Sequence, residues 1–543
     1  MPFQLIENIK KTAGHITYST PLYSWCLNDK APDRLIVKPV DPWPGNADKA
    51  RELLNAAGIG ERTGALWYKE WWEPEEADDI WHTHMHSFGW LRDLRTLGGA
   101  LAKEQGRVML SSWIERYDHW DKNSWRSDLI GRRLAMWISH YDYFCAGQGD
   151  HFEEKVLASL SKQAKHLSNI LGATHTPALL ETIKGLLYVG IALEDHDKWI
   201  NQAINALEKT LSVQILADGG HISRSPDVML NVLQILVDIR SAFKAGAYTT
   251  PGFIKDTIEQ LSAALRSLRH SDRKLALFHG TQEGSIDHID SVLAQAGTRK
   301  KTLSSLEKTG FERLDLGRSL LIMDTGRAPD YPYDKDAHAS PLAFEFGYGK
   351  ERLLVSCGSH PISPDWKEAL RFTAAHNTAC LDHRNACEIK KDKHFGRKTV
   401  KCNARREETH NSILLSASHD GYVPLNGITH TRTLCLTDQG HSLHGEDGFT
   451  SASDHLTNPV EVAVRFHIHP NVMASVTQDG QDILLRMPGG VGWRFSTKHH
   501  GIKLEDSLYV GQGIDIKKTK QIVIGSHMKD LNISVKWSLK RED

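Results

Sequence analysis

The hydrophobic residues of this 543-residue chain change their spacing near residue 305, and that change limits the folds open to it. Between about residues 45 and 300, apolar residues recur three and four positions apart, for example along 199–211, which is the period of an amphipathic helix. After the polar, basic stretch 298–305 the apolar residues alternate with polar ones, as in a half-buried strand. The pattern predicts a helical domain over 1–305 and a β domain over 306–543.

Length and composition agree with two domains and point to no unusual class of protein. Single hydrophobic cores stop growing at roughly 250 to 300 residues, so a chain of this length needs two. The net charge is -1 at pH 7, so no overall basic field exists to attract nucleic acid or a membrane surface. We therefore expect neither partner, and an acidic ligand would have to meet a local basic patch. The oligomeric state stays open.

The helical half reads as repeated helix hairpins. Asp218-Gly219-Gly220 is expected to close one helix, and Ser225 followed by Pro226 supplies an N-cap and a first-turn proline for the next. Such hairpins over about 250 residues favour an α/α toroid or a large bundle, and the period does not choose between these.

The β half reads as many short antiparallel strands. The alternating segments 342–346 and 352–355 flank a glycine-containing turn and predict a hairpin. In the segment 461–469 the apolar residues share one face, while Arg465, His467 and His469 share the other. This pattern predicts an antiparallel β-sandwich.

The cysteines and the N-terminus predict a cytoplasmic protein. Seven cysteines are spread singly, without the pairs of a metal site or a disulfide framework. The first residues lack the apolar core of a secretory signal, and no apolar run approaches the roughly 18 residues of a membrane span.

Three short segments of the β half carry groups suited to acid-base chemistry. Ala374-Ala375-His376-Asn377-Thr378, His419-Asp420-Gly421-Tyr422 and His430-Thr431-Arg432 bring imidazoles, a phenol and a guanidinium onto predicted neighbouring strands. Such groups abstract protons and neutralise anions. We take His376 as a candidate base and Tyr422 as a candidate acid, and we take Asn377 and Arg432 as candidate substrate-binding groups.

The chain resembles the heparinase II/III-like polysaccharide lyases, in particular a bacterial branch of cytoplasmic-looking proteins. Segments similar to those of the family occur in the family's order over most of the chain, at 81–94, 131–137, 218–226, 374–378, 419–422, 430–432, 465–470 and 504–509. The resemblance implies an α/α toroid joined to a β-sandwich. It also implies an enzyme that cleaves a uronic-acid-containing polysaccharide by β-elimination.

The resemblance also implies roles for residues of the helical half. In the family an Asn or His of the toroid neutralises the uronate carboxylate, and His175 lies close to that position. In the family, a Tyr that follows shortly after the loop matched here by 218–226 protonates the leaving oxygen. In this chain Val228 stands at the position of that Tyr. Tyr422, His221 or His279 would then supply the acid, and Arg224 could hold a uronate or sulfate through two parallel hydrogen bonds.

No cofactor is required for this chemistry, although the resemblance leaves room for a structural zinc. In some family members the histidine that matches His376 joins an Asp and a later His around the metal. His430 is the candidate for the later ligand here, with Asp392 or His394 as the ligand between.

Three functions remain open on the sequence alone. The first is a lyase acting on an acidic poly- or oligosaccharide in the cleft between the domains. The second is a non-catalytic binder of acidic glycans, which Val228 motivates. The third is a glycoside hydrolase using a carboxylate pair, either Asp195 with Asp197 or Asp218 with Glu283.

Overall fold

The computed structural model describes residues 17–28, 31–56, 72–74, 78–147, 150–173, 178–452, 454, 456, 458–499 and 501–542. The chain forms two compact units. We call them the helical unit, made of Met1–Ser212 and Gln234–Lys255, and the mixed unit, made of Val213–Leu233 and Asp256–Asp543.

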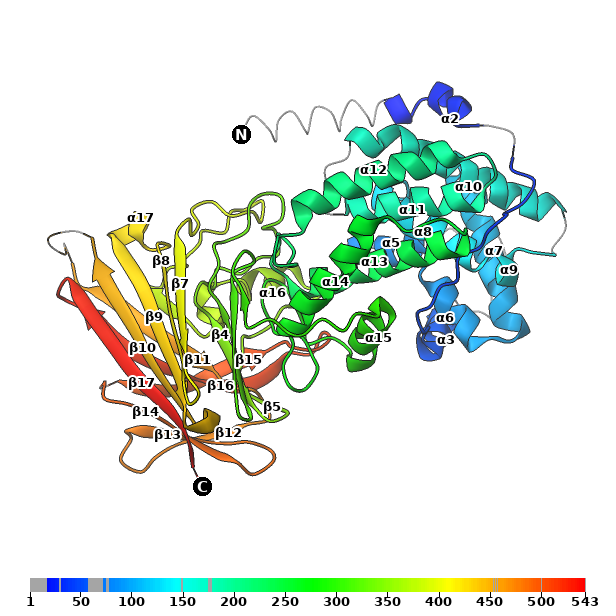
Figure 1. Ribbon diagram of the computed structural model, residues 1–543. Helices are drawn as coiled ribbons and strands as arrows, with labels where there is room; N and C mark the ends of the chain where they lie inside the picture. The colour runs from blue at the N-terminus through cyan, green and yellow to red at the C-terminus, as the bar shows by residue number, and fades with distance from the viewer. Residues whose placement is uncertain are drawn as a thin grey trace. The chain divides into compact units, whose positions relative to one another are not determined.

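The helical unit is built from helices packed against one another (Figure 1). Its described helices are α2 (Pro21–Leu27), α3 (Ala47–Ala56), α5 (Asp79–Ser87), α6 (Trp90–Leu97), α7 (Gly99–Tyr117), α8 (Ser127–Ser139), α9 (Tyr141–Phe144), α10 (Asp150–Ile170), α11 (Leu179–Ala192) and most of α12 (Asp197–Gln214). Two more helices, α13 (Pro226–Ala245) and α14 (Gly252–Ser267), each contribute residues to both units.

Two glycines let α8 and α11 cross closely in the middle of the helical unit. A Cβ atom on Gly131 would lie 2.0 Å from the Glu181 carbonyl oxygen, and one on Gly185 would lie 2.4 Å from the Gly131 Cα. Any larger residue would therefore force the two helices apart. Gly131 belongs to a family-like segment, and this crossing is the physical reason for a glycine there.

The mixed unit contains the helix α15 (Ile286–Ala296) and three antiparallel sheets (Figure 1). The five-stranded sheet has the order β1 (Ser305–Leu306), β2 (Phe311–Leu316), β3 (Ser319–Asp324), β4 (Phe344–Tyr348), β5 (Glu351–Leu354). The eight-stranded sheet has the order β12 (Met473–Val476), β13 (Asp482–Arg486), β14 (Gly492–Thr497), β17 (Asn532–Glu542), β10 (Ser442–Ser451), β9 (Ile428–Thr437), β8 (Ile413–His419), β7 (Cys402–Glu408). The four-stranded sheet has the order β15 (Ile502–Tyr509), β16 (Lys517–Met528), β11 (Val460–His467), β6 (Ala379–Leu381).

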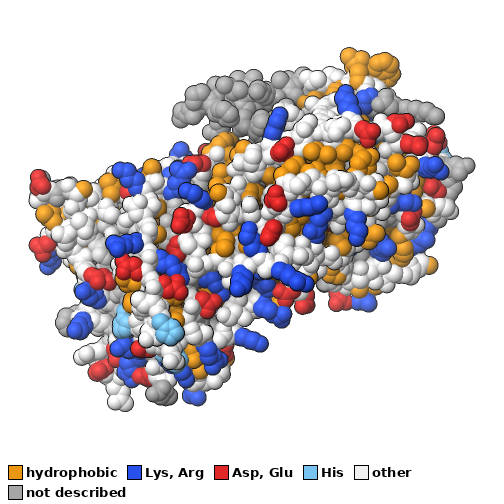
Figure 2. Space-filling view, in the orientation of Figure 1, with side chains coloured by type: hydrophobic (Ala, Val, Ile, Leu, Met, Phe, Trp, Pro, Cys, Tyr) orange, Lys and Arg blue, Asp and Glu red, His pale blue; other side chains and the backbone are white. Residues whose placement is uncertain are grey.

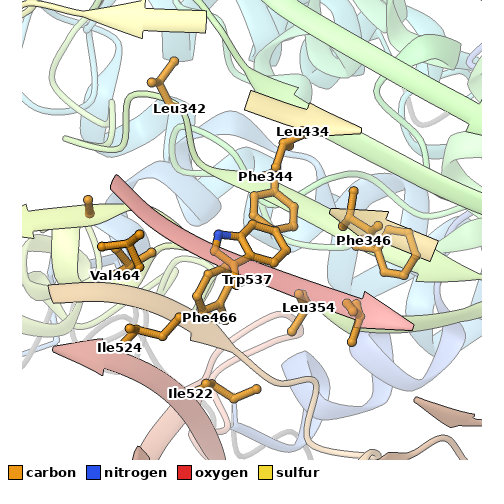
Figure 3. Packing of buried hydrophobic residues seen from close by; sticks show 14 of the residues in the cluster. Leu342, Phe344, Phe346, Leu354, Leu434, Val464, Phe466, Ile522, Ile524 and Trp537 are labelled. Carbon is orange, nitrogen blue, oxygen red and sulfur yellow. The ribbon is translucent and has the colours of Figure 1, made fainter. Parts of the chain in front are cut away.

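Side chains from all three sheets share one apolar core, which Figure 3 shows around Trp537. The Trp537 ring stacks on Phe344 with a centroid distance of 5.8 Å and meets Phe466 edge-on at 4.7 Å. Along β9 and β8, buried and half-buried residues alternate strictly, which is the period read from the sequence. The predicted hairpin is confirmed as β4 paired with β5.

The predicted domain boundary at residue 305 marks a change of secondary structure and not the edge of a compact unit. The last helix before the sheets ends at Ala296, and β1 begins at Ser305. The mixed unit nevertheless takes in Val213–Leu233 and everything from Asp256 onward. The period of apolar residues reports the local element, whereas a unit's edge depends on which elements pack together.

Buried charges explain why the segment before the sheets belongs to the mixed unit. The Arg352 guanidinium on β5 donates to Asp272 at 2.8 and 3.2 Å and to the Leu275 carbonyl at 2.9 Å. His270 lies 2.8 Å from Glu345 on β4. Buried charges need such partners, so these residues fix the connection between α14 and α15 to the strands.

Among the described helices, none is long and apolar enough to cross a membrane.

Candidate functional site

A short hairpin after α12 brings two polar side chains together. Ile222 N–H donates to the Gln214 carbonyl at 2.8 Å, and Leu216 N–H donates to the Gly220 carbonyl at 2.8 Å. Gly219, with φ of +84°, makes the turn, which is a conformation that favours glycine. The segment Asp218-Gly219-Gly220, which was predicted to close a helix, therefore forms the turn of this hairpin just beyond the helix. The consequence is that Gln214 lies beside His221.

His221 is a buried, neutral histidine with both ring nitrogens engaged. The Ser223 N–H donates to Nδ1 at 3.0 Å, so the proton is on Nε2, which faces Gln214 Oε1 at 3.3 Å. Burial lowers the pKa of His221 to about 4. Both ring nitrogens of His221, predicted as a candidate acid, thus contact protein groups in this structure.

Tyr333 is the residue that Gln214 contacts, and it was not predicted. It lies in the loop that joins β3 to β4, and its side chain is half-buried. Gln214 Nε2 donates to Tyr333 Oη at 3.2 Å, and the Tyr333 ring meets the His221 ring edge-on at 5.8 Å. Among the described residues, none accepts the Tyr333 hydroxyl proton. No periodic pattern or motif points to this loop residue, since its partner is 119 positions away.

Arg224 fastens the same loop and is not free to bind substrate. Its guanidinium donates to the carbonyls of Thr309 at 2.6 Å, Gly310 at 2.8 Å and Arg327 at 3.1 Å, and it forms an ion pair with Asp324. The residue is buried and has φ of +63°, a conformation that costs a non-glycine residue about 1–3 kcal/mol. In this structure Arg224, predicted to bind substrate, is engaged by these groups and contacts the start of the Tyr333 loop through the Arg327 carbonyl.

Three histidines form a buried row in the mixed unit. His279 Nε2 lies 3.1 Å from Asp324 Oδ2, the His338 N–H donates to His279 Nδ1 at 3.2 Å, and the rings of His338 and His376 are 4.6 Å apart. His376 is fully buried, and neither of its ring nitrogens has a hydrogen-bond partner among the described residues. Burial lowers its pKa to about 3. The structure buries both His376 and His279, so neither ring of these two predicted catalytic residues reaches solvent.

Arg432 belongs to a buried ion-pair network in the sandwich. Its Nε donates to Asp447 Oδ1 at 2.7 Å, and its Nη1 donates to the Leu342 carbonyl at 2.9 Å. His430 and Trp537 also contact the Asp447 carboxylate, at 2.8 and 2.9 Å. Burial alone would raise the pKa of Asp447, but Arg432 and His430 outweigh it and hold that pKa well below its usual range. Arg432 is thus a core cation and not a substrate-binding group.

Tyr422 and Asn377 are also core residues. The Tyr422 hydroxyl donates to the Ala379 carbonyl at 2.7 Å, and burial raises its pKa well above the ordinary value. The Asn377 amide donates to the Phe344 carbonyl at 2.7 Å and accepts from the His467 N–H at 2.6 Å. Both side chains, the predicted acid and the predicted substrate-binding amide, are fully buried in this structure. His467, expected on a polar face, is also buried, and its ring contacts the Ser507 hydroxyl and the Ala374 carbonyl.

The structure does not assemble the predicted zinc ligands. His430 is occupied by His419 and Asp447, while Asp392 is exposed and accepts only from the His394 N–H, at 3.1 Å. In the parts of the chain that the structure describes, no three His, Cys, Asp or Glu side chains are grouped so that they could hold a metal ion. The fourth predicted substrate-binding residue, His175, lies outside the described residues.

The carboxylate pairs considered for hydrolysis are engaged elsewhere or lie at the surface. Asp218 accepts from the backbone of Lys308 at 2.8 Å and of Thr309 at 2.7 Å. Glu283 is buried and contacts Tyr509, Gln512 and Lys274. Asp195 and Asp197 are exposed at the start of α12. None of these pairs presents two available carboxylates to one space.

A basic segment lies against the Tyr333 loop. Residues 388–401 contain six lysines and arginines and two acidic residues, in a chain whose net charge is -1. Ile389 and Phe395 form a bridge that folds the segment into a hairpin. Lys390, Lys391 and Lys401 are exposed. This cluster was missed, although the run Lys390-Lys391-Asp392-Lys393 is a visible charge signal.

Acidic residues of the Tyr333 loop hold the basic segment in place. Asp334 accepts from the Phe395 N–H at 2.7 Å and lies 2.6 Å from His394 Nδ1. Asp330 forms an ion pair with Lys398. On the face shown in Figure 2, Lys and Arg are interspersed with Asp and Glu, which fits a near-neutral chain. The excess of Lys and Arg in residues 388–401 therefore makes this segment a candidate binding site for an anion.

Two family models match nearly the whole chain. The model described as heparinase II/III N-terminus matches residues 70–295, and the model described as heparinase II/III-like, C-terminal matches residues 298–538. The fold and these matches define the class as that of the toroid-and-sandwich polysaccharide lyases. The chain belongs to the heparinase II/III-like family.

One curated relative is named FtsZ-localized protein C and comes from Caulobacter vibrioides (strain NA1000 / CB15N). It is 27% identical over 529 residues, covering 94% of this chain and 91% of the relative.

Solved structures of polysaccharide lyases share the fold. A structure of heparinase III matches with a TM-score of 0.71 and 13% identity, over 98% of this chain and 91% of that one. A mutant of the heparan sulfate lyase HepC from Pedobacter heparinus matches with a TM-score of 0.69 and 16% identity, over 93% and 85%. The chondroitin AC lyase of Streptomyces coelicolor A3 matches with a TM-score of 0.56 and 11% identity, over 96% and 80%. The predicted α/α toroid followed by an antiparallel β-sandwich is confirmed.

Proposed function

We propose that this protein is a polysaccharide lyase that cleaves an acidic, uronic-acid-containing poly- or oligosaccharide by β-elimination. Membership of the heparinase II/III-like family supports the reaction class. The observation that carries the proposal is the basic segment 388–401, which Asp330 and Asp334 hold against the loop that bears Tyr333. A cationic surface beside an available phenol combines the two needs of the reaction, anion neutralisation and proton transfer.

The exposed lysines of the basic segment would bind the polymer through its repeated negative charges. Such contacts are electrostatic and weaken with added salt, because the Debye length falls to about 10 Å at 0.1 M ionic strength. They also raise the rate of encounter with an anionic chain. We therefore expect the segment to govern the KM for substrate more than kcat.

The test begins with the purified wild-type protein and a panel of uronate polymers, sulfated and unsulfated. Ultraviolet-absorbing unsaturated ends would support the lyase. New reducing ends without that absorbance would show a hydrolase, and saturable binding without products would show a binding protein. Either of the last two results contradicts the proposal.

A charge reversal then tests the basic segment. The double variant Lys390→Glu, Lys391→Glu should raise the KM at least tenfold at low salt and lose most of that difference at high salt. The matched control is Lys517→Glu, Lys518→Glu, an adjacent pair of exposed lysines on β16, which should change the KM less than twofold. Equal effects of the two double variants would remove the basic segment from substrate binding.

A second candidate function is a non-catalytic protein that localises with FtsZ. The relative with 27% identity over 94% of this chain carries that localisation in its name, and Val228 stands where the family has its catalytic Tyr. Co-sedimentation with purified FtsZ polymers would support it, provided the wild type also gives no unsaturated product. Absence of co-sedimentation would count against this candidate.

A further inference from the structure

We infer that Tyr333 is the phenol that transfers the proton in this site and that Gln214 positions it. The inference rests on the proposed lyase function and names the catalytic group that Val228 leaves unassigned. Three observations support the inference. Gln214 Nε2 donates a hydrogen bond to Tyr333 Oη, the phenol is half-exposed, and the basic segment lies beside the Tyr333 loop.

The other tyrosines of the mixed unit do not offer an available hydroxyl at a polar site. Tyr422 and Tyr348 are buried in the core. Tyr509 is buried, and its hydroxyl contacts Glu283. Tyr331 is 43% exposed, and its ring packs on His394 at 4.7 Å rather than on the Gln214 hairpin. Tyr333 alone among these five residues combines exposure with a side-chain amide directed at its oxygen.

A chain of hydrogen bonds fixes the direction in which Gln214 points. The Ser223 N–H occupies His221 Nδ1, which leaves the proton on Nε2 facing Gln214 Oε1. With its oxygen held there, the Gln214 amide directs its N–H toward Tyr333 Oη. A hydrogen bond donated to an oxygen favours the charged form of that oxygen. Gln214 thus holds Tyr333 Oη in position without contacting the substrate.

Proton transfer in the reaction step involves only the substrate and this phenol, while the basic segment 388–401 would neutralise the uronate carboxylate. The Tyr333 phenolate oxygen removes the proton from the carbon next to the uronate carboxylate, C5. The electron pair of that C–H bond forms the C4=C5 double bond, and the C4–O4 bond breaks with its electron pair on O4. The phenol then gives the proton to O4, which regenerates the phenolate. Atoms and electrons balance, and the products are an unsaturated uronate end and a free hydroxyl.

The first experiment compares Tyr333→Phe with the matched control Tyr331→Phe, two positions earlier in the same loop. Because acid-base catalysis contributes about 10²- to 10⁴-fold, Tyr333→Phe should lower kcat at least a hundredfold on the best polymer of the panel. Tyr331→Phe should stay within threefold of wild type. Both variants should keep the wild-type Tm, since each change affects an incompletely buried hydroxyl.

The second experiment tests Gln214 through the pH profile. Gln214→Met keeps the length of the side chain but cannot donate a hydrogen bond. The pH at which kcat/KM rises should move upward in this variant, by about one unit or more. A purely structural role for Gln214 would lower activity without moving the profile.

The outcomes separate the inference from the proposed function. If the wild type makes unsaturated product and Tyr333→Phe is equally active, the inference is overturned and the lyase stands. If the wild type makes no unsaturated product from any polymer, the lyase proposal fails and Tyr333 loses its role with it. If Tyr333→Phe loses its fold, the pH profile of Gln214→Met decides, and an unshifted profile overturns the inference.

Discussion

The network around Arg432 and the loop around Tyr333 make opposite use of polar side chains. Arg432, Asp447 and His430 are fully buried and satisfy one another at 2.7 to 2.8 Å. Tyr333 is half-buried, and Gln214 is its one recorded hydrogen-bond partner among the described residues. The first arrangement is closed off from solvent, while the second leaves a hydroxyl proton available.

The comparison shows that a residue in a family-like segment need not be available to a ligand. The family-like segments His430-Thr431-Arg432 and His419-Asp420-Gly421-Tyr422 form the interior of the sandwich, where a buried charge needs every partner it has. Tyr333 belongs to none of these segments, and it lies in a loop between two strands. Polar residues in the strongest family segments therefore maintain this fold, and loops carry the groups that can meet a substrate.

The largest expected effect comes from breaking the buried network. Arg432→Ala should lower the free energy of unfolding by about 3–5 kcal/mol, because it leaves the buried Asp447 carboxylate without its guanidinium partner. The control Arg405→Ala removes an 82% exposed side chain paired with Glu407 and should cost about 0–1 kcal/mol. Urea unfolding followed by circular dichroism measures both. Similar values for the two variants would show that the network does not hold the sandwich together.

Acid should destabilise the protein through its buried histidines. Burial lowers the pKa of His376 to about 3 and that of His221 to about 4, so the folded state stays neutral while the unfolded state gains protons below about pH 6.5. The contribution of these neutral histidines to the free energy of unfolding is therefore complete above pH 6.5. It falls as the pH drops toward 3, by at most about 1.4 kcal/mol per pH unit for each histidine.

Substitution of one histidine isolates its share of this acid sensitivity. His376→Asn should flatten the dependence of Tm on pH between 6.5 and 4, whereas the exposed control His410→Asn should leave it unchanged. The groups that act on His376 in the folded state are His467, His279 and Asp324, and all three remain in both variants. An unchanged slope in His376→Asn would contradict its burial as a neutral imidazole.

A smaller effect should separate Tyr422 from Tyr333. Tyr422→Phe leaves the Ala379 carbonyl without its buried donor and should lower the free energy of unfolding by about 1–2 kcal/mol, with no loss of kcat on any polymer that the wild type cleaves. Tyr333→Phe should show the reverse pattern, with kcat lost and stability kept. Thermal unfolding and product absorbance on the same preparations decide the matter, and a loss of kcat in Tyr422→Phe would restore it as the acid.

The smallest expected effect is that of Asp392→Ala. This exposed carboxylate accepts one hydrogen bond from a backbone N–H, so its loss should change the free energy of unfolding by less than about 0.5 kcal/mol. Elemental analysis should find equal zinc in the variant and the wild type. Zinc that is present in the wild type and lost in the variant would show that Asp392 is a ligand after all.

Much of the fold followed from the sequence, but little of the site did. The change of apolar period placed the last helix and the first strands within a few residues of their positions, and the hairpin β4–β5 was predicted correctly. The site residues were chosen for their chemistry within family-like segments. His376 and Tyr422 have suitable chemistry, but the packing of other elements around them removes both from solvent.

What the sequence by itself determined is local: the period of the apolar residues, the glycines at tight crossings, the family and the basic run at 388–401. Tertiary structure alone decided which polar groups are satisfied and which remain available. Arg224 meets carbonyls about 85 to 103 positions away, and Gln214 meets Tyr333 across 119. The period of a helix or strand depends on neighbours along the chain, whereas the exposure of a side chain depends on elements that only folding brings beside it.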